Sequence, residues 1–314
     1  MKSLITGGTG FVGIYLARYL QMLGHEVAVT KMPGEQIFIS GVSVYDLNIL
    51  EKEEVSRLFT KIQTDYIFHL AAQSSVAISW KNPGLTIDVN IKGSTNVLDA
   101  FRALENKPRL LLPGSGEEYG CVQSTELPVG EEHVLKPGNI YAATKVCQNM
   151  IGSIYAKAYG LDIVMTRAFN HVGPNQAPFF VLADFCRQTA EIEAGKREPV
   201  IRAGNLDVKR DFTDVRDVVC AYVMLAEKGR AGETYNIGSG QARSIREILQ
   251  TVINKSTAKI QVEVDEKKLR PIDMTEMRAD IQKIQKVTGW KPKICLEQSI
   301  QDTLDYWRRE YLQE

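Results

Sequence analysis

Two side chains have the types and spacing that could move a proton beside an arriving hydride. Tyr141 and Lys145 stand four residues apart, so on a helix they would lie one turn apart on the same face. A phenol can protonate a carbonyl oxygen while hydride reaches the carbon, and a neighbouring ammonium favours the phenolate. The alternative is an ordinary surface pair, since both residue types are common on helices. The segment 136–139 (KPGN) indicates a helix start just before the pair, which favours the chemical interpretation.

A glycine-rich segment near the first residue could hold the cofactor that hydride chemistry needs. Residues 7–13 (GGTGFVG) follow the apolar strand 4–6 and open a helical pattern. Backbone amides at a helix start can bind a pyrophosphate, although a strand-to-helix turn can need glycine for steric reasons alone. Together with Tyr141 and Lys145, this turn predicts a dinucleotide site for the reduction of a ketone or the oxidation of an alcohol.

The composition predicts a globular protein with no general affinity for anions. The chain has 314 residues, 44% of them hydrophobic, which is enough for a full core. Its 38 basic and 38 acidic residues give zero formal charge, so neither nucleic acid nor a membrane is expected as a partner. The five scattered cysteines suit neither a zinc site nor a redox pair, and we expect a reduced, cytoplasmic protein without metal. The N-terminal apolar run is too short for a signal or a membrane span.

Strands alternate with helices through the first half of the sequence, which predicts a Rossmann-type, doubly wound parallel sheet. Strands are expected at 4–6, 26–30, 42–45, 66–70, 109–112 and 162–166, and later helices at 181–194, 244–254 and 296–311. We predict a dinucleotide-binding domain over 1–169, which also takes in parts of 213–237 and 272–280, and a smaller C-terminal α/β lobe mainly over 170–314. Ligands of such sheets bind at the carboxyl edge, so the cleft between the two parts is the expected active site.

Several motifs together resemble the extended short-chain dehydrogenase/reductase family of nucleotide-sugar enzymes. They are the glycine-rich turn, the segment 69–72 (HLAA), Ser115 after a strand and the Tyr141/Lys145 pair, and the resemblance covers nearly the whole chain. Segments 71–76, 116–120, 169–174 and 204–212 are similar to the branch with GDP-mannose 4,6-dehydratase and GDP-4-keto-6-deoxymannose reductase. The stretch 210–217, with residues 235–236, is closer to the reductase.

The resemblance implies a reaction and its catalytic residues. The reaction is NADP(H)-dependent reduction of the carbon-4 ketone of GDP-4-keto-6-deoxy-D-mannose to GDP-6-deoxy-D-mannose (GDP-D-rhamnose). Tyr141 would donate the proton, Lys145 would assist it, and Ser115 would donate a hydrogen bond to the developing oxyanion. Glu117 stands where the dehydratase has a base for the proton at sugar carbon 5, or else is a loop carboxylate bonded to neighbouring amides.

Three other functions stay open at this point. GDP-mannose 4,6-dehydratase, a lyase, is the first alternative, and a nucleotide-sugar 4-epimerase is a broader one. The short segment 31–34 (KMPG) lacks the paired arginines usual in the dehydratase, which favours the reductase. A non-catalytic NADP-binding regulator is the third, and the intact Ser115, Tyr141 and Lys145 argue against it.

Residue types after the second strand distinguish the two nicotinamide dinucleotides. An acidic side chain there would bind the adenosine ribose and repel a 2′-phosphate, whereas this chain has Lys31, which attracts phosphate unless it is only a solvated loop charge. NADP(H) is therefore favoured, with NAD(H) as the alternative. Asp46 would accept from the adenine amino group or cap the following helix. The resemblance implies cofactor contacts by Gly7, Thr9, Gly10, Phe11, Val12, Gly13, Lys31, Asp46, Leu47, Leu70, Ala71, Ala72, Tyr141 and Lys145.

A nucleoside diphosphate without a metal needs fixed cations, and the planar fork of arginine suits phosphate. The resemblance implies that Arg210 and Arg270 bind the diphosphate, while a surface salt bridge is the alternative for each. The other substrate-binding residues that it implies are Ser75, Glu117, Asn170 and Asn205.

The helix through Asn96, Val97 and Phe101 bears on assembly. In the family this helix and the one carrying Tyr141 pair with a second subunit, so we expect a homodimer. The apolar residues of the helix could equally face the sheet.

Overall fold

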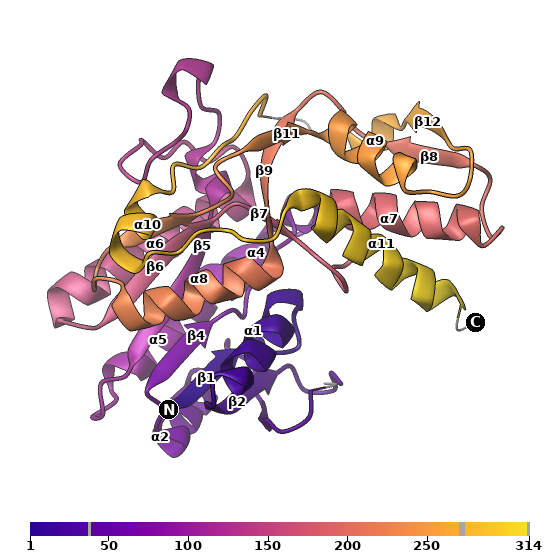
Figure 1. The fold of residues 1–314 in the computed structure, drawn as a ribbon. Helices are drawn as coiled ribbons and strands as arrows, with labels where there is room; N and C mark the ends of the chain where they lie inside the picture. The colour runs from indigo at the N-terminus through magenta and orange to yellow at the C-terminus, as the bar shows by residue number, and fades with distance from the viewer. Residues whose placement is uncertain (37–38, 270–273, 313–314) are drawn as a thin grey trace.

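A seven-stranded parallel sheet forms the centre of the computed structural model, which describes residues 1–36, 39–269 and 274–312 (Figure 1). The strand order is β3-β2-β1-β4-β5-β6-β10, and each neighbouring pair is parallel. The inner strands are apolar runs buried on both faces, as parallel strands covered by helices must be. The strands are β1 (Lys2–Thr6), β2 (Glu26–Lys31), β3 (Ser43–Asp46), β4 (Tyr66–His69), β5 (Arg109–Ser115), β6 (Ile163–Ala168) and β10 (Thr234–Ile237).

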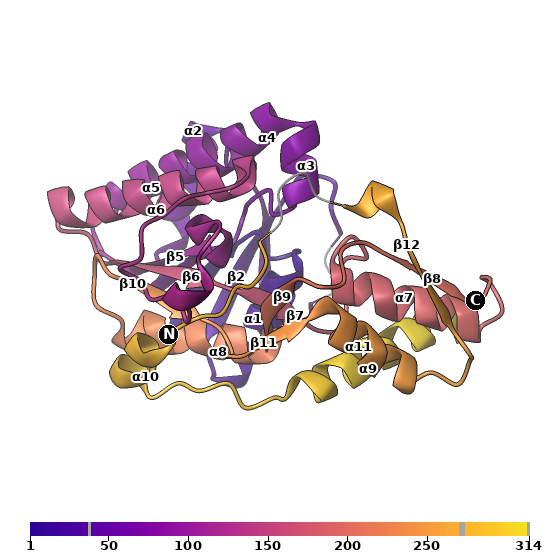
Figure 2. The same ribbon diagram turned by 90° about the horizontal axis from the view of Figure 1, so that it is seen from above.

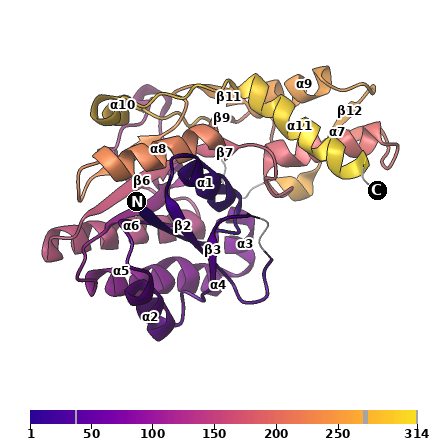
Figure 3. The same cartoon turned by 60° about the horizontal axis from the view of Figure 1, so that its bottom comes forward.

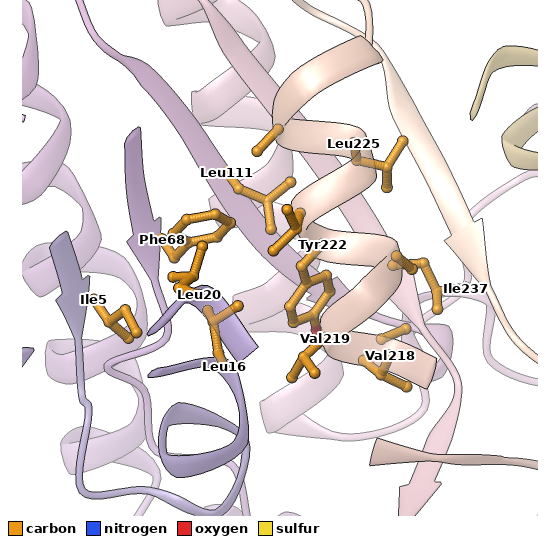
Figure 4. Packing of buried hydrophobic residues seen from close by; sticks show 14 of the residues in the cluster. Ile5, Leu16, Leu20, Phe68, Leu111, Val218, Val219, Tyr222, Leu225 and Ile237 are labelled. Carbon is orange, nitrogen blue, oxygen red and sulfur yellow. The ribbon is translucent and has the colours of Figure 1, made fainter. Parts of the chain in front are cut away.

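Helices cover both faces of this sheet (Figure 2). One face carries α1 (Phe11–Met22), α8 (Val215–Lys228) and α10 (Gln282–Thr288), and the other carries α2 (Lys52–Ile62), α5 (Ser94–Arg102) and α6 (Ile140–Tyr159). Figure 4 shows the first of these cores, in which Leu16 and Leu20 of α1 pack beside Tyr222 of α8. Burying a side chain of this size contributes about 1.5–3 kcal/mol, so the apolar stripe of each helix fixes which face it covers.

The second face also carries two short helices and a π-helical turn that lead into α5. They are α3 (Val76–Lys81), α4 (Pro83–Ile87) and η1 (Asp88–Gly93). Val97 and Phe101 of α5 are buried in the core against the sheet. These side chains were expected either at a subunit interface or against the sheet, and in the structure they face the sheet.

A smaller lobe with its own core follows β6 (Figure 3). In it α7 (Val181–Glu193) packs on α9 (Ile245–Asn254) and α11 (Leu296–Leu312). The sequence patterns predicted these helices but not the strands of this lobe. Those strands form two small sheets, β11 (Ala242–Ser244) with β9 (Lys209–Asp214) and β7 (Asn170–Val172), and β8 (Val200–Ala203) with β12 (Gln261–Val264).

The predicted doubly wound α/β fold is confirmed, and the differences lie at element ends. β5 runs on to Ser115, three residues beyond the apolar run that predicted it. α1 ends at Leu23, its exposed C-cap, and Gly24 follows with φ +80°. β10 and α8 come from the segment 213–237 and belong to the large sheet. Residues 272 and 273 of the segment 272–280 lie outside the described residues. No helix within the described ranges is both long and apolar enough to cross a membrane.

Candidate active site

The order of the central strands reverses between β1 and β4, and the glycine-rich turn lies at the carboxyl end of β1. A Cβ on Gly7 would lie 2.8 Å from backbone atoms of Ala71, and one on Gly13 would lie 2.6 Å from the Gly7 carbonyl oxygen. Helix α1 starts at this turn without a side-chain cap or an acidic residue in its first turn. Its first amides are therefore available to an anion, and the turn fits the pyrophosphate of a dinucleotide.

The other residues expected at this end of the cofactor surround the same turn. Phe11 stacks on His171 of β7, with ring centroids 6.3 Å apart and an angle of 13° between the rings. The amide of Ala71 donates to the hydroxyl of Thr6 at the end of β1, which joins the segment after β4 to the turn. Gly10 is exposed, and Val12, Leu70 and Ala72 are half-buried.

The adenosine end of the expected site differs from the sequence interpretation. Lys31 is not a solvated charge, because its Nζ lies 2.5 Å from Asp46 Oδ1. Asp46 is not a helix cap, because Glu51 is the N-cap of α2. The side chains of Lys31 and Asp46 are 17% and 59% exposed, and such a pair is worth at most about 1 kcal/mol. A phosphate could therefore displace Asp46 from Lys31 at little cost.

Two further residues, Leu47 and Thr9, were expected to contact the cofactor, and both make contacts within the chain. Leu47 is buried in the core, and only its backbone amide, which donates to Lys31, lies at the strand end. Thr9 donates its hydroxyl to Glu35 at 2.8 Å, and the amide of Met32 donates to the same carboxylate. Sequence reasoning did not identify Glu35, because nothing in its neighbours predicts a bond back to the glycine turn.

Ser115 ends β5 and caps the 3₁₀ turn η2 (Gly116–Tyr119). Its hydroxyl accepts from the amide of Glu117 at 3.2 Å, and its own amide donates to Glu118 at 2.8 Å. This reciprocal pair is a capping box, which holds the serine in one orientation. A Cβ on Gly114 would lie only 2.2 Å from Asn149 Nδ2 and from Glu118 Oε1, so the approach to Ser115 tolerates only glycine.

Glu118 stabilises this turn by accepting from the Ser115 amide. The sequence alone did not identify this residue. The fully buried carboxylate also accepts from Asn149 Nδ2 of α6 and from Arg167 Nε of β6, each within 2.9 Å. Burial raises the pKa of Glu118, and the charge of Arg167 acts in the opposite direction. The acidic pair at 117–118 was visible in the sequence, but only the tertiary structure shows which of the two is buried.

Tyr141 and Lys145 lie one turn apart on α6, as predicted. The helix begins at the predicted place, because the Asn139 side chain accepts from the amide of Ala142 at 2.8 Å. The other end of that side chain donates to Glu117 Oε2 at 2.9 Å and so ties the helix start to the η2 turn. Burial raises the pKa of Tyr141, while hydrogen bonding with Ser115 acts to lower it. Tyr141 is thus a protonated phenol beside Ser115, ready to act as a proton donor.

The Lys145 side chain is only 5% exposed. Its Nζ donates to the Pro113 carbonyl oxygen at 3.0 Å and to Gln148 Oε1 at 2.9 Å. Burial lowers the pKa of Lys145 to about 8, against the opposite effect of Glu118. Lys145 therefore changes charge close to neutral pH. Gln148 was missed by sequence reasoning, since glutamine carries no chemical signal of its own.

A narrow cavity joins the η2 turn to the smaller lobe. Arg210 is buried beside it and donates from Nη1 to the Met274 carbonyl oxygen at 2.7 Å. The lining brings together four residues predicted for catalysis or substrate binding, which are Ser115, Glu117, Asn170 and Arg210. The cavity thus places an arginine and an amide beside Ser115.

Two other predicted substrate residues, Ser75 and Asn205, do not line this cavity. Ser75 is the N-cap of α3 and accepts from the amide of Ile78 at 3.3 Å. Asn205 is exposed, and its side chain accepts from the amide of Asp207. Arg270 lies outside the described residues. A larger cavity of about 680 Å³ opens where β6 and β10 begin, but ligands of such sheets bind where the strands end, so we assign it no role.

One family profile matches most of the chain. Its description is GDP-mannose 4,6 dehydratase, and it matches residues 4–303. Among curated proteins, GDP-6-deoxy-D-mannose reductase of Pseudomonas aeruginosa is 32% identical and covers 100% of this chain and 99% of its own length. GDP-mannose 4,6-dehydratase of Yersinia enterocolitica is 28% identical, over 95% of this chain and 91% of its own.

Solved structures with the same fold include a reductase and an epimerase. The structure of RMD from Pseudomonas aeruginosa complexed with NADPH has a TM-score of 0.88 at 31% identity, covering 98% of this chain and 99% of that one. UDP-glucose 4-epimerase of Thermus thermophilus in complex with NAD also has a TM-score of 0.88, at 29% identity and with the same coverage. The likeness extends over both the sheet and the smaller lobe.

Proposed function

Because this chain belongs to the GDP-mannose 4,6-dehydratase family, we propose that it reduces the carbon-4 ketone of GDP-4-keto-6-deoxy-D-mannose with NADPH. The product would be GDP-6-deoxy-D-mannose. A relative that is 32% identical over the full length carries the name of that reductase, which supports this member of the family over the dehydratases. The observation that carries the proposal is the cavity that places Ser115 and Arg210 together, beside the helix of Tyr141 and Lys145.

Each residue of the proposed site has a separate role in the reduction of the ketone. When bound at the glycine-rich turn, a nicotinamide dinucleotide supplies hydride to the ketone. Tyr141 donates its phenolic proton to the carbon-4 oxygen, and Ser115 donates a hydrogen bond to the same oxygen as charge develops there. The ammonium of Lys145 lowers the cost of the phenolate that remains. Arg210 neutralises the diphosphate of the substrate, and Asn170 contacts the substrate from the same cavity. Substrate contacts by Ser75, Asn205 and Arg270 stay predictions, because the first two do not line this cavity and the third lies outside the described residues.

We favour NADP(H) over NAD(H) on two grounds. The solved structure of RMD from Pseudomonas aeruginosa contains NADPH. In this chain Lys31 lies at the end of β2, where a 2′-phosphate would approach, and its ion pair with Asp46 is partly exposed. NAD(H) remains the alternative, since the Thermus thermophilus epimerase binds NAD.

The experiment offers the purified protein two substrates in parallel. One reaction contains the 4-keto-6-deoxy sugar nucleotide with NADPH, and the other contains GDP-mannose with NADP. We expect one NADPH oxidised for each sugar reduced in the first, with the mass of the product raised by two hydrogens, and no water loss in the second. Tyr141→Phe should lower the first rate by roughly 10²–10⁴-fold and leave NADPH affinity intact. Water loss from GDP-mannose would overturn the reductase assignment.

GDP-mannose 4,6-dehydratase is the second candidate, and Glu117 is the observation that favours it. This carboxylate lines the same cavity as Ser115 and accepts a hydrogen bond from Asn139, which supports a role as the base for the proton at sugar carbon 5. Glu117→Gln separates the two functions. The substitution should abolish dehydration if that is the reaction, and should leave ketone reduction within a few-fold of the unchanged protein otherwise.

We also propose a homodimer in the cytoplasm. Val97 and Phe101 cannot contribute to the interface, because they pack against the sheet. Exposed apolar side chains on the neighbouring helices α4 and α6 support the pairing instead, and these are Leu85, Ile87, Met150 and Ile154. The five free cysteines are compatible with a reducing compartment. We divide the chain into a cofactor domain over 1–169 with β10 and α8, and a substrate lobe over most of 170–314.

A further inference from the structure

The ammonium of Lys145 is buried between two neutral oxygen atoms. A lysine ammonium has three N–H donors, and burying any of them without an acceptor is costly. Two donors bond to the Pro113 carbonyl and to Gln148 Oε1, at 3.0 and 2.9 Å. Within the described part of the chain, Nζ has no third hydrogen-bond partner. One donor is thus left to face a ligand.

Gln148 is held so that its oxygen must face the lysine. It lies three residues after Lys145 on α6, is 1% exposed, and donates from Nε2 to the same Pro113 carbonyl at 3.1 Å. Lys145, Gln148 and Pro113 therefore close a three-membered ring of hydrogen bonds. If the amide turned over, its NH₂ would point at the ammonium, donor against donor, so the charge of Lys145 itself fixes this orientation.

We propose that Gln148 is a positioning residue that holds the Lys145 ammonium in its catalytic place and leaves its third donor for the bound cofactor. The proposal rests on the reductase function above for its kinetic test. It assigns Gln148 no contact with the substrate or the reacting atoms, because the amide lies on the side of the lysine that faces Pro113.

The groups around Lys145 explain why a neutral acceptor is needed. Glu118 of η2 acts on the ammonium as a charge, but it is hydrogen-bonded to Ser115, Asn149 and Arg167 instead. His69 of β4 is neutral, because burial lowers its pKa to about 3. Tyr141 of α6 is also protonated, since burial raises its pKa. Among these groups none gives Lys145 a close charged acceptor, so the two oxygen atoms carry that role.

Two substitutions separate positioning from packing. Gln148→Met keeps the approximate volume but removes the acceptor, whereas Gln148→Glu keeps an acceptor and adds charge. Gln188→Met is the matched control, because Gln188 is also 1% exposed but lies on α7 in the smaller lobe. For each protein, NADPH affinity (by fluorescence titration), kcat and KM are all measured across pH, and thermal unfolding checks the fold.

Gln148→Met should weaken NADPH binding and lower kcat roughly tenfold or more, the usual effect of losing a hydrogen bond to a charged group. It should also move the alkaline limit of kcat/KM down by about one pH unit, because the buried ammonium loses an acceptor. Gln148→Glu should move that limit upward and restore most of kcat. Gln188→Met should change neither quantity, even if it lowers thermal stability.

Several outcomes would overturn the proposal. One is an alkaline limit of kcat/KM that does not move in either Gln148 variant. Another is a loss of NADPH affinity and kcat in Gln188→Met as large as that in Gln148→Met. If Gln148→Met does not fold, the direction of the shift in Gln148→Glu decides alone. If the unchanged protein does not reduce the 4-keto sugar, the proposed function fails, while the NADPH titrations across pH still test Gln148.

Discussion

Replacing Glu118 by glutamine tests whether the buried ion pair of Glu118 with Arg167 stabilises the η2 turn that follows Ser115. The carboxylate is fully buried, and the side chain of its partner Arg167 is 9% exposed. One carboxylate oxygen accepts from the Ser115 amide and the other from Arg167 Nε. Whichever way a glutamine amide turned, its NH₂ would face one of these donors. The substitution therefore removes a charge and leaves a buried donor without an acceptor.

Two effects of opposite sign determine how much Glu118→Gln changes the free energy of unfolding. Burial raises the pKa of Glu118 and so favours a neutral group at this position. Against this, leaving one member of a buried ion pair without its partner costs about 3–5 kcal/mol. We expect the second effect to be the larger one and the net loss of stability to be about 3 kcal/mol, the low end of that range. The reason is that three donor groups converge on the carboxylate and none of them can bond to an NH₂ group. With an unfolding entropy of about 2.1 cal/mol/K per residue, this loss corresponds in a chain of 314 residues to a fall in Tm of roughly 4–5 °C.

Thermal and urea unfolding followed by circular dichroism measure this loss. Glu105→Gln is the matched control, since Glu105 is exposed and should cost less than about 0.5 kcal/mol. A cycle with Glu118→Leu, Arg167→Met and the double variant should give a coupling free energy of about 1.5 kcal/mol or more. If Glu118→Gln is as stable as the unchanged protein, burial dominates at this site and our reasoning is wrong. A coupling near zero would show that the pair contributes nothing specific.

Gly13→Ala should weaken NADPH binding at least tenfold, because its Cβ would lie 2.6 Å from a backbone oxygen, whereas Gly130→Ala, whose added Cβ meets no described atom within 4 Å, should bind normally. Fluorescence titration measures both, and equal affinities would count against the glycine turn. Across pH, kcat/KM should fall as pH rises through about 8, since burial lowers the pKa of Lys145 to about 8 and only its ammonium can assist Tyr141. A rate unchanged well above that pH would exclude this role. Lys31→Met should weaken NADPH binding several-fold and leave NADH binding nearly unchanged, and an equal loss for both would show that Lys31 does not contact the 2′-phosphate.

Local patterns predicted the elements well because their causes are local. The helix predicted at 244–254 and the alternation of strands with helices depend on residues close in sequence, and these predictions are confirmed. The ends of the elements were harder to predict. For example, β5 continues through Pro113 and Gly114 to Ser115 only because β6 pairs with it along that length. The strands of the smaller lobe were not predicted. Four of them have only three or four residues, and β9, with six, has a single apolar side chain and so gives no apolar run.

The predicted site residues divide in the same way. The glycine turn and the Tyr141/Lys145 pair are local motifs, so the sequence could place each on its element. Which residues support them could not be read from the sequence, because their partners are distant in the chain. Glu118 meets Arg167 across 49 residues, and Thr9 meets Glu35 across 26. The pairing of Lys31 with Asp46 depended likewise on two strands lying side by side.

The sequence by itself determined the fold class, the glycine-rich turn after β1 and the helix that carries a phenol and an ammonium, since each follows from spacing within one or two elements. Only the tertiary structure decided that Glu118 is the buried member of the acidic pair, that Val97 and Phe101 face the sheet, and that Gln148 holds Lys145. The physical reason is that burial and hydrogen-bond partnership are properties of packed neighbours. Packing joins residues whose separation along the chain has no period to reveal it.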